Sequence, residues 1–427
     1  MRYREYGKTG IKLSALGFGC MRFPMSGGGV NRGRTTEMLH RAMDLGVNFF
    51  DTAVMYCNEQ SEEALGEAIK GRRDELYIST KNPYKGDDPR EWRKCLDRSL
   101  QRLGVDHIDF YHFHDLKLDE YEDRLLPQGS INEALRAKEE GLIDHLCFSS
   151  HDDPPNIIRL IDTDLFEGLL VQYNFLDRHN EEAIAYAHRK GLGVCIMGTV
   201  GGGRLVPLGR KAKATEGEGT IPDLAIRFVL SNPGVTVALS GMGTIRMVEE
   251  NVASASRAEP LSPEENGRIL QLVTQTKPLQ GLYCTGCNYC MPCPVGVNVP
   301  ANFEILNLER VFGLTEHARQ SYAQLPGKAA LCRACGKCLE ACPQKIDIPR
   351  RLGDAVKALD RARDGVSDDL KPAIYDAYLK VAEKFVAQGK KADAMRIYTL
   401  LNRDNVPKLV RTAAINGIVS ASGGKTK

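Results

Sequence analysis

Eight of the thirteen cysteines stand in two short runs near the C-terminal third of the chain. They are Cys284, Cys287, Cys290 and Cys293 in the first run, and Cys332, Cys335, Cys338 and Cys342 in the second. Each run reads C-x2-C-x2-C, adds a fourth cysteine and is followed by a proline. Three thiolates at this spacing can bind one iron–sulfur cluster, and a fourth cysteine completes its coordination. The spacing therefore predicts two [4Fe–4S] clusters.

Zinc is the competing interpretation of these cysteines, because C-x2-C pairs also fit a tetrahedral site of four thiolates. Zinc ligands, however, usually come as separated pairs, whereas three cysteines recur here at the same spacing twice. The second run, CRACGKCLEACP, follows the bacterial ferredoxin pattern without deviation. The first run is one residue shorter before its last cysteine. We therefore favour iron–sulfur clusters over zinc.

Composition limits the partners and the compartment. The formal net charge of +2 gives no electrostatic reason to expect nucleic acid or an anionic membrane as a partner. No apolar run approaches the length needed to span a bilayer. The N-terminal sequence MRYREYGKTG lacks the apolar core of a signal peptide. We expect a cytoplasmic protein in a reducing compartment, where disulfides are rare.

Short apolar runs alternate with amphipathic stretches from about residue 10 to 276. The candidate strands are residues 13–19, 47–53, 76–81, 108–114, 145–151, 168–174, 193–199 and 235–241. Eight strand–helix units of this length are typical of a closed parallel (β/α)8 TIM barrel, an α/β fold. An open doubly wound sheet usually shows G-x-G-x-x-G after its first strand, and GFGCMRF does not supply that motif. We predict a barrel over residues 1–277.

The cysteine-containing segment, residues 278–350, shows a second internal repeat. An apolar-x-apolar-Pro segment follows each cysteine run, as VNVP at 297–300 and IDIP at 346–349. NFEILNLERVFG, between the two halves, has apolar residues at helical spacing. These features predict a mainly helical ferredoxin-like domain with two [4Fe–4S] clusters. We expect residues 351–427 to form a helical extension that ends in a disordered tail, SASGGKTK.

Polar residues stand at the C-terminal ends of three consecutive predicted barrel strands. Asp51 and Tyr56 follow the second strand, Lys81 ends the third and His114 ends the fourth. Functional residues of such barrels collect at this face. A phenol normally titrates near pH ~10, and a neighbouring ammonium group favours its ionised form. We therefore expect an acid–base site in which Asp51 positions the lysine and His114 binds a substrate oxygen.

The set Asp51, Tyr56, Lys81 and His114 resembles the catalytic tetrad of the aldo-keto reductases. The resemblance extends over most of residues 1–277 and includes YGKTGIKLSALGFG, SEEALGEAI, LGVDHIDFYHFH, FSSH, VQYN and GMGTIRMVEEN. It implies that Tyr56 is the general acid and base and that Asp51 and Lys81 tune it. His114, rather than His112, takes the histidine role because it holds the last position of its strand; we expect His112 to fill the barrel interior.

The same resemblance implies NADPH or NADH extended across the barrel mouth. The positions that match or replace the family's cofactor-binding residues are Ser149, Ser150 and Gln172 for the carboxamide, Met197 at the nicotinamide ring, Gly241 at the phosphate segment, and Glu250 and Asn251 near the adenine. In two-cluster ferredoxins, the fourth cysteine of each run binds the other cluster. That similarity implies one cluster on Cys284, Cys287, Cys290 and Cys342, and another on Cys332, Cys335, Cys338 and Cys293.

The function implied is an oxidoreductase that transfers a hydride between NAD(P)H and a carbonyl or alcohol substrate, with clusters that exchange electrons with a redox partner. Hydride transfer moves two electrons, whereas a [4Fe–4S] cluster ordinarily accepts one. Two alternatives therefore stay open. The clusters can be structural, in an ordinary NAD(P)H carbonyl reductase, or the whole chain can be a non-enzymatic redox- or nicotinamide-sensing module. The substrate and the oligomeric state do not follow from the sequence.

Overall fold

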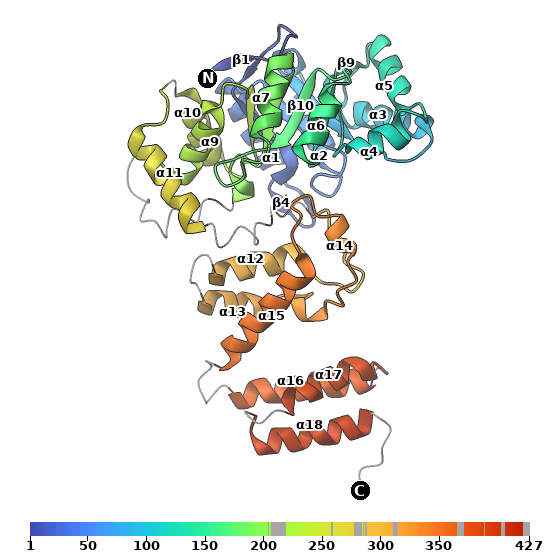
Figure 1. Ribbon diagram of the computed structural model, residues 1–427, viewed down its shortest axis with the longest axis vertical. Helices are drawn as coiled ribbons and strands as arrows, with labels where there is room; N and C mark the ends of the chain where they lie inside the picture. The colour runs from blue at the N-terminus through green and yellow to red at the C-terminus, as the bar shows by residue number, and fades with distance from the viewer. Residues whose placement is uncertain are drawn as a thin grey trace.

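The computed structural model describes residues 1–203, 205, 219–257, 259–276, 284, 286, 288–310, 315–364, 371–387, 389–402 and 406–421. Cys287, the predicted domain boundary at 277 and 278, and residues 422–427 of the predicted disordered tail lie outside the described residues. Figure 1 shows three parts arranged along the long axis: a barrel at the N-terminal end, a small helical domain below it, and a group of C-terminal helices.

Eight parallel strands close into a barrel in the order β10-β11-β12-β3-β6-β7-β8-β9. Their bounds are β3 Leu16–Gly19, β6 Phe49–Asp51, β7 Tyr77–Asn82, β8 Ile108–Phe113, β9 Ile143–Ser150, β10 Gly168–Gln172, β11 Gly193–Met197 and β12 Val237–Ser240. All eight overlap the predicted strands, and the predicted (β/α)8 barrel is confirmed.

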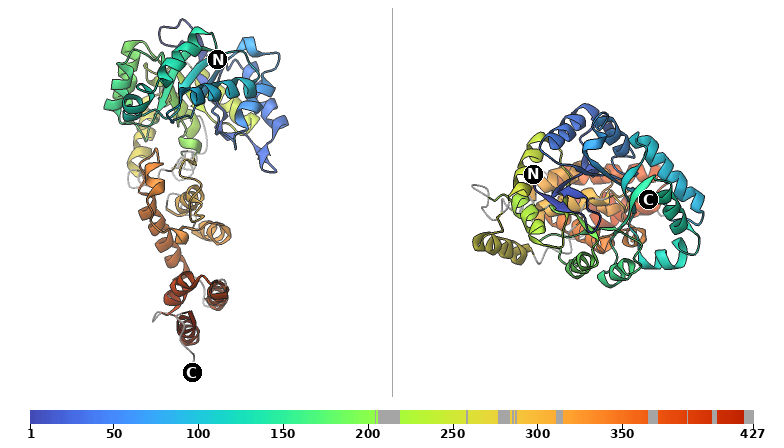
Figure 2. Two further views of the ribbon diagram at one scale, coloured as in Figure 1. Left: turned by 90° about the vertical axis from the view of Figure 1, so that its right-hand side faces the viewer. Right: turned by 90° about the horizontal axis from the view of Figure 1, so that it is seen from above.

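Helices surround the strands, as the view from above in Figure 2 shows. They are α1 Arg32–Asp44, α2 Ser61–Ala68, α3 Pro89–Leu103, α5 Ser130–Glu139, α6 Pro154–Ile161, α7 Glu181–Lys190, α9 Ile221–Ser231 and α10 Ile245–Ser256. One further helix, α11 (Pro263–Thr276), packs its Ile269 and Leu272 into a core shared with Leu224. Because the strands are parallel, their C-terminal ends all open at one face of the barrel.

An antiparallel hairpin, β1 (Tyr3–Glu5) and β2 (Lys12–Ser14), precedes the first barrel strand. The expected continuous strand at 13–19 is therefore wrong. Leu13 and Ser14 belong to the hairpin strand β2, and the barrel strand β3 begins only at Leu16. Tyr6 follows β1 and lies fully buried in the barrel interior. A Cβ atom at Gly168 or Gly193 would lie 1.8 or 2.4 Å from Tyr6 atoms. Glycine is required at both positions because the tyrosine side chain occupies that space.

The domain below the barrel mouth is helical where it is described. Its helices are α12 Val299–Arg310, α13 Thr315–Gln324, α14 Lys337–Glu340 and α15 Ile348–Asp364. The two copies of the predicted repeat meet in one core, which contains Val297, Val299, Ile346 and Ile348. The proline of each copy lies in the first turn of α12 or α15. Backbone N–H groups in the first turn have no partner within the helix, so proline, which lacks this group, is tolerated there. The mainly helical domain is therefore confirmed.

The C-terminal extension forms three further helices, α16 (Lys371–Ala387), α17 (Lys391–Leu401) and α18 (Lys408–Ala421). Gly389 joins the first two with a φ of 74°, a conformation that glycine adopts without strain. The predicted helical extension is confirmed where it is described. Their shared core contains Tyr398 and is separate from the barrel core. No helix among the described residues is long and apolar enough to cross a membrane.

Candidate functional site

The centre of the candidate site is an ion pair buried at the mouth of the barrel. Asp51 ends β6, and β7 lies beside it with Ser79 in register. Side chains of a strand alternate between its two faces, so Ser79 and Lys81 of β7 point to the same side. The Lys81 ammonium group lies 2.7 Å from both carboxylate oxygens of Asp51 and 2.6 Å from the carbonyl oxygen of Thr52. Both side chains are buried, with exposures of 1% and 5%.

Tyr56 and His114 lie around this ion pair. The Lys81 Nζ atom is 5.1 Å from the centroid of the Tyr56 ring. The Tyr56 and His114 rings stand nearly perpendicular, with centroids 6.3 Å apart. His114 is fixed by its backbone N–H, which donates to the carbonyl oxygen of Asn82 at 3.0 Å. The structure thus brings the four residues of the predicted tetrad together at the C-terminal ends of the strands.

The loop that carries Tyr56 has an unusual backbone. The next three residues, Cys57, Asn58 and Glu59, have φ values of 53°, 56° and 65°. Three consecutive non-glycine residues in the left-handed region cost free energy and persist only where the surroundings hold them. The Cys57 thiol donates to the carbonyl oxygen of Met21 at 3.4 Å, which ties the loop to the short helix that follows β3, Cys20–Arg22. Such strain is common at functional sites.

Both histidines of β8 and its end are held neutral. Burial, and then the nearby Lys81 ammonium, lower the pKa of His114 well below its usual value. A neutral imidazole can donate one hydrogen bond and accept another without bringing a charge. Burial lowers the pKa of His112 to about 3. Its two ring nitrogens are buried and have no hydrogen-bond partner among the described residues. His112 faces the barrel interior, as the sequence predicts.

Two cavities meet at Tyr56. The smaller, about 150 Å³, is lined by Asp51, Tyr56, three of the predicted cofactor positions and the residue that ends β12. These are Gln172, Met197, Ser240 and Gly241. The larger, about 750 Å³, is lined by Tyr56, His114 and several methionines, Met21, Met25, Met55 and Met291. The smaller cavity has two of the four predicted nicotinamide-binding positions, Gln172 and Met197, in its wall, and the larger has room for a substrate.

The remaining predicted cofactor residues lie outside the walls of these cavities. The Ser149 hydroxyl accepts from the backbone N–H of Asp115 at 2.9 Å, and the Ser150 hydroxyl donates to the carbonyl oxygen of Leu116 at 2.7 Å. Both serines therefore support the loop after β8 in this structure. Asn251 donates to the Ser240 hydroxyl at 3.0 Å, behind the smaller cavity. Glu250 is exposed on α10 and pairs with Arg246 at 3.3 Å.

Gln172 is bonded on both sides. Its Nε2 donates to Asp177 Oδ2 at 2.5 Å and to Gln344 Oε1 at 2.8 Å. Gln344 Nε2 in turn donates to Gln172 Oε1 at 2.8 Å. A residue of the helical domain therefore pairs with a predicted cofactor residue of the barrel. Tyr289 makes a second such contact, because its hydroxyl lies 2.8 Å from His114 Nε2.

The cysteines of the two runs are interleaved. Cys284 and Cys290 of the first run share a small cavity with Cys342, the last cysteine of the second run. Burial raises the pKa of Cys338, and nearby thiols of Cys332, Cys335 and Cys293 raise it further, so Cys293 lies with the second run. Four soft thiolates per site are the donor set that a [4Fe–4S] cluster needs. The positions of the described cysteines fit the exchanged fourth ligand that ferredoxins show.

Comparison with known proteins agrees with both parts of the chain. The Aldo/keto reductase family model matches residues 15–274, more than half of the chain. The chain belongs to the aldo/keto reductase family. A 4Fe-4S dicluster domain model matches residues 283–346 of the reductase. We use the term dicluster domain for this helical domain below.

Individual relatives cover the barrel. The uncharacterized oxidoreductase YqkF of Bacillus subtilis is 27% identical over 313 residues, 65% of this chain and 97% of that protein. L-galactose dehydrogenase of Arabidopsis thaliana is 28% identical over 296 residues, 61% of this chain and 90% of that protein. The holo form of aldo-keto reductase AKR11C1 from Bacillus halodurans matches with a TM-score of 0.55 and 26% identity, covering 64% of this chain and 96% of that one.

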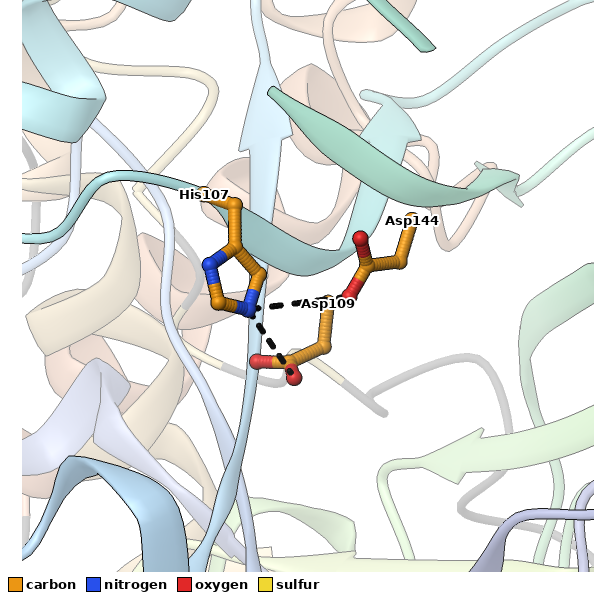
Figure 3. Close-up of side chains that lie close together, drawn as sticks. All are labelled: His107, Asp109 and Asp144. Atoms are coloured by element: carbon orange, nitrogen blue, oxygen red, sulfur yellow. Dashed lines mark ion pairs between the residues drawn. The ribbon is translucent and has the colours of Figure 1, made fainter. Parts of the chain in front are cut away.

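A separate polar cluster lies at the opposite, N-terminal ends of β8 and β9 (Figure 3). His107 Nε2 is 4.0 Å from Asp109 Oδ1 and 3.7 Å from Asp144 Oδ2. Asp109 Oδ2 already accepts from Arg73 at 2.7 Å and from the backbone N–H of Ile78 at 2.8 Å. The cluster therefore joins β7 to β8 in the reductase, and its ion pairs account for it without a metal.

Tyr289 and Gln344 are the site residues that sequence reasoning missed. Tyr289 directly precedes Cys290, and Gln344 follows Cys342 by two positions. Because both residues stand next to predicted cluster ligands, nothing in the sequence indicated that they contact the barrel site. The available signal was weak: a tyrosine and a glutamine beside the cysteines, with no periodicity and no motif of their own.

Proposed function

We propose that this chain is an NAD(P)H-dependent oxidoreductase that interconverts a carbonyl and an alcohol, with Tyr56 as the group that gives and takes the proton. The observation that carries this proposal is the buried Lys81–Asp51 pair, 5.1 Å from the Tyr56 ring, at the mouth of the barrel. Family membership supports an oxidoreductase, and the name of the relative L-galactose dehydrogenase supports a substrate with a hydroxyl group.

Proton transfer is the part of the reaction for which the described residues are arranged. When bound, the nicotinamide supplies or accepts the hydride. In the reducing direction, Tyr56 donates its phenolic proton to the carbonyl oxygen as negative charge develops there. The ammonium group of Lys81 favours the phenolate that is left, and Asp51 holds that ammonium in place. Neutral His114 orients the substrate oxygen through a ring nitrogen without competing as an acid.

The nicotinamide end of NADPH or NADH would lie along the smaller cavity. Gln172 offers amide groups to the carboxamide, and Met197 and Gly241 form the wall around it. Asn251 supports that wall through Ser240. The exposed Glu250 belongs to the helix expected near the adenine. Ser149 and Ser150 would contribute through the loop that their hydroxyls hold.

We assign two [4Fe–4S] clusters to the dicluster domain. The proposed ligands are Cys284, Cys287, Cys290 and Cys342 for one, and Cys332, Cys335, Cys338 and Cys293 for the other. Asn288 and Pro343 line the first cysteine cavity and also the active-site cavities, so the two sites share walls. Cys335 is exposed. This arrangement supports electron exchange between the site and a redox partner. The proposed domains are residues 1–277, 278–350 and 351–427.

The test is Tyr56→Phe, which removes the phenolic hydroxyl and keeps the ring. We expect kcat/KM for carbonyl reduction to fall by about 10²–10⁴-fold, the usual contribution of general acid–base catalysis. The assay is anaerobic oxidation of NADPH and NADH with a panel of carbonyl substrates. The matched control is Tyr3→Phe, because the Tyr3 hydroxyl donates to the Gly46 carbonyl oxygen beside the N-terminal hairpin and lines neither active-site cavity. Equal turnover by both variants would refute the assignment.

A further inference from the structure

The dicluster domain places two side chains on the groups that the barrel offers to its ligands. Tyr289 and Gln344 are 55 positions apart in the sequence. Gln344 lines the cavity of the first cysteine site, and Tyr289 stands between Asn288 and Cys290, which line it too. Each makes one specific contact with a barrel residue of the proposed active site, His114 or Gln172. Both contacts cross between domains, and each uses the chemical group that a ligand would present.

The first contact imitates the nicotinamide. Gln344 gives Gln172 a primary amide and forms a reciprocal pair with it, N–H to oxygen in both directions at 2.8 Å. A nicotinamide carboxamide is the same chemical group. The remaining bond of Gln172, to Asp177, is internal to the barrel. Both Nε2 hydrogens of Gln172 are then used, so a carboxamide can form the same reciprocal pair with Gln172 only after Gln344 leaves it.

The second contact imitates the substrate. The Tyr289 hydroxyl lies 2.8 Å from His114 Nε2, the nitrogen on the side of the large cavity. A carbonyl or alcohol oxygen bound between His114 and Tyr56 would need the same nitrogen. Tyr289 lines both the small and the large cavity, as Tyr56 does. Its hydroxyl thus occupies the position expected for the reacting oxygen.

We propose that Tyr289 and Gln344 are active-site residues supplied by the dicluster domain, which hold His114 and Gln172 in the ligand-free enzyme and are displaced by substrate and nicotinamide. The inference rests on the proposed function, because it takes Gln172 and His114 as ligand-binding groups. It goes beyond that function by making ligand binding and the position of the dicluster domain mutually dependent. Binding at either position weakens the hold of the domain on the barrel.

The size of the effect follows from competition. If the binding-competent state is a fraction f of the enzyme, the apparent dissociation constant is the intrinsic one divided by f. A neutral hydrogen bond contributes a factor of roughly 2–10 to such an equilibrium, and Gln344 makes two with Gln172. Removing its amide should therefore tighten nicotinamide binding by about 5–30-fold.

The experiment compares full-length, cluster-loaded variants under anaerobic conditions. Gln344→Ala removes the amide, Tyr289→Phe removes the hydroxyl, and Lys345→Ala is the matched control. Lys345 pairs with Asp153 across the same domain contact, but both groups are exposed and neither borders a cavity. NADPH and NADH affinities are measured by isothermal titration calorimetry. Iron and sulfide content of each variant verifies that the clusters are intact.

We expect Gln344→Ala to tighten nicotinamide binding by about 5–30-fold and Lys345→Ala to change it less than about 2-fold. Tyr289→Phe should lower KM for the carbonyl and, because it loosens the same domain contact, tighten nicotinamide binding by less than Gln344→Ala does. In the unaltered protein, NADPH should speed amide hydrogen exchange in residues 288–293 and 343–348. These results together would support the inference.

Different failures have different meanings. If the unaltered protein binds nicotinamide and Gln344→Ala binds it equally well, the inference is wrong and the proposed function stands. If Lys345→Ala tightens binding as much as Gln344→Ala, a general loosening of the domain explains the effect, and the assignment to Gln344 falls. If no variant binds NADPH or NADH, the inference and the proposed function both fall.

Discussion

The buried Lys81–Asp51 pair allows a quantitative prediction about the stability of the barrel. The Nζ atom lies within 2.7 Å of three oxygen atoms, and the two side chains are 1% and 5% exposed. Lys81→Met leaves the Asp51 carboxylate buried without its partner, and Asp51→Asn does the same to the ammonium. Removal of one member of such a pair costs about 3–5 kcal/mol of unfolding free energy, because the remaining charge is uncompensated.

The double variant Asp51→Asn/Lys81→Met removes both charges together. It should therefore cost much less than the sum of the single variants, which is about 6–10 kcal/mol. An apolar or neutral replacement of a buried pair is often close to neutral, so we expect the double variant to lie within about 3 kcal/mol of the unaltered protein. The coupling energy in the double-mutant cycle would then exceed about 3 kcal/mol.

The chain offers a specific probe for this measurement. Trp92 is its single tryptophan, fully buried in α3 against Tyr111 and Phe113 of the barrel. Urea unfolding followed by Trp92 fluorescence reports on the barrel and not on the other two parts of the chain. Additive effects in the double variant would show that the two charges do not interact. Single-variant costs below about 1 kcal/mol would show a solvated pair, and either result would refute the reasoning.

Two further predictions concern the cluster ligands and the acid response. Cys342→Ser should lose about half of the iron, and Cys342→Ser/Cys284→Ser should lose no more, because Cys342 and Cys284 are assigned to the same cluster. Cys342→Ser/Cys338→Ser should lose nearly all of the iron, because Cys338 is assigned to the other cluster. Cys95→Ser is the control, and equal iron loss in the two double variants would contradict the exchange of the fourth ligand. Burial lowers the pKa of His112 to about 3, so the unfolded chain, with a histidine pKa near ~6.5, takes up the proton first as pH falls. The contribution of neutral His112 to the free energy of unfolding is therefore present above pH ~6.5. It falls by about 1.4 kcal/mol per pH unit as the pH is lowered to about 3. His112→Gln should flatten the pH dependence of urea unfolding between pH 6 and 5, and an unchanged slope would count against it.

The sequence predicted the barrel and the meeting of its polar residues because both follow from local rules. Eight alternating strand–helix units leave few topologies, and parallel strands bring their C-terminal ends to one face. Asp51, Lys81 and His114 each end or follow a strand, so their convergence needed no tertiary information. The repeat around Val297 and Ile346 likewise follows from the spacing to the cysteines, and the structure buries both copies in one core.

The rest required contacts between distant segments. His114 and Tyr289 are 175 positions apart, and Gln172 and Gln344 are 172 positions apart. No sequence periodicity relates such residues, because the pattern around each one reflects only the secondary structure of its own domain. The two serines show the converse problem. Ser149 and Ser150 stand at the C-terminal end of β9, within the predicted strand. Their hydroxyls form hydrogen bonds with backbone groups of the loop after β8 and not with the cavity.

The contact between the domains bears on why an aldo/keto reductase barrel carries a dicluster domain. A structural clip would be expected to extend an apolar core across the boundary, as α11 does with the barrel. Among the described residues, the core of the dicluster domain is separate from that of the barrel. The contacts between the two domains include an amide pair, a phenol–imidazole contact and an exposed ion pair. Contacts of this polar kind are typical of domains that move relative to one another. Because the amide pair and the phenol–imidazole contact fall on Gln172 and His114, which line the active-site cavities, the arrangement favours clusters coupled to ligand binding over clusters that only hold the fold together.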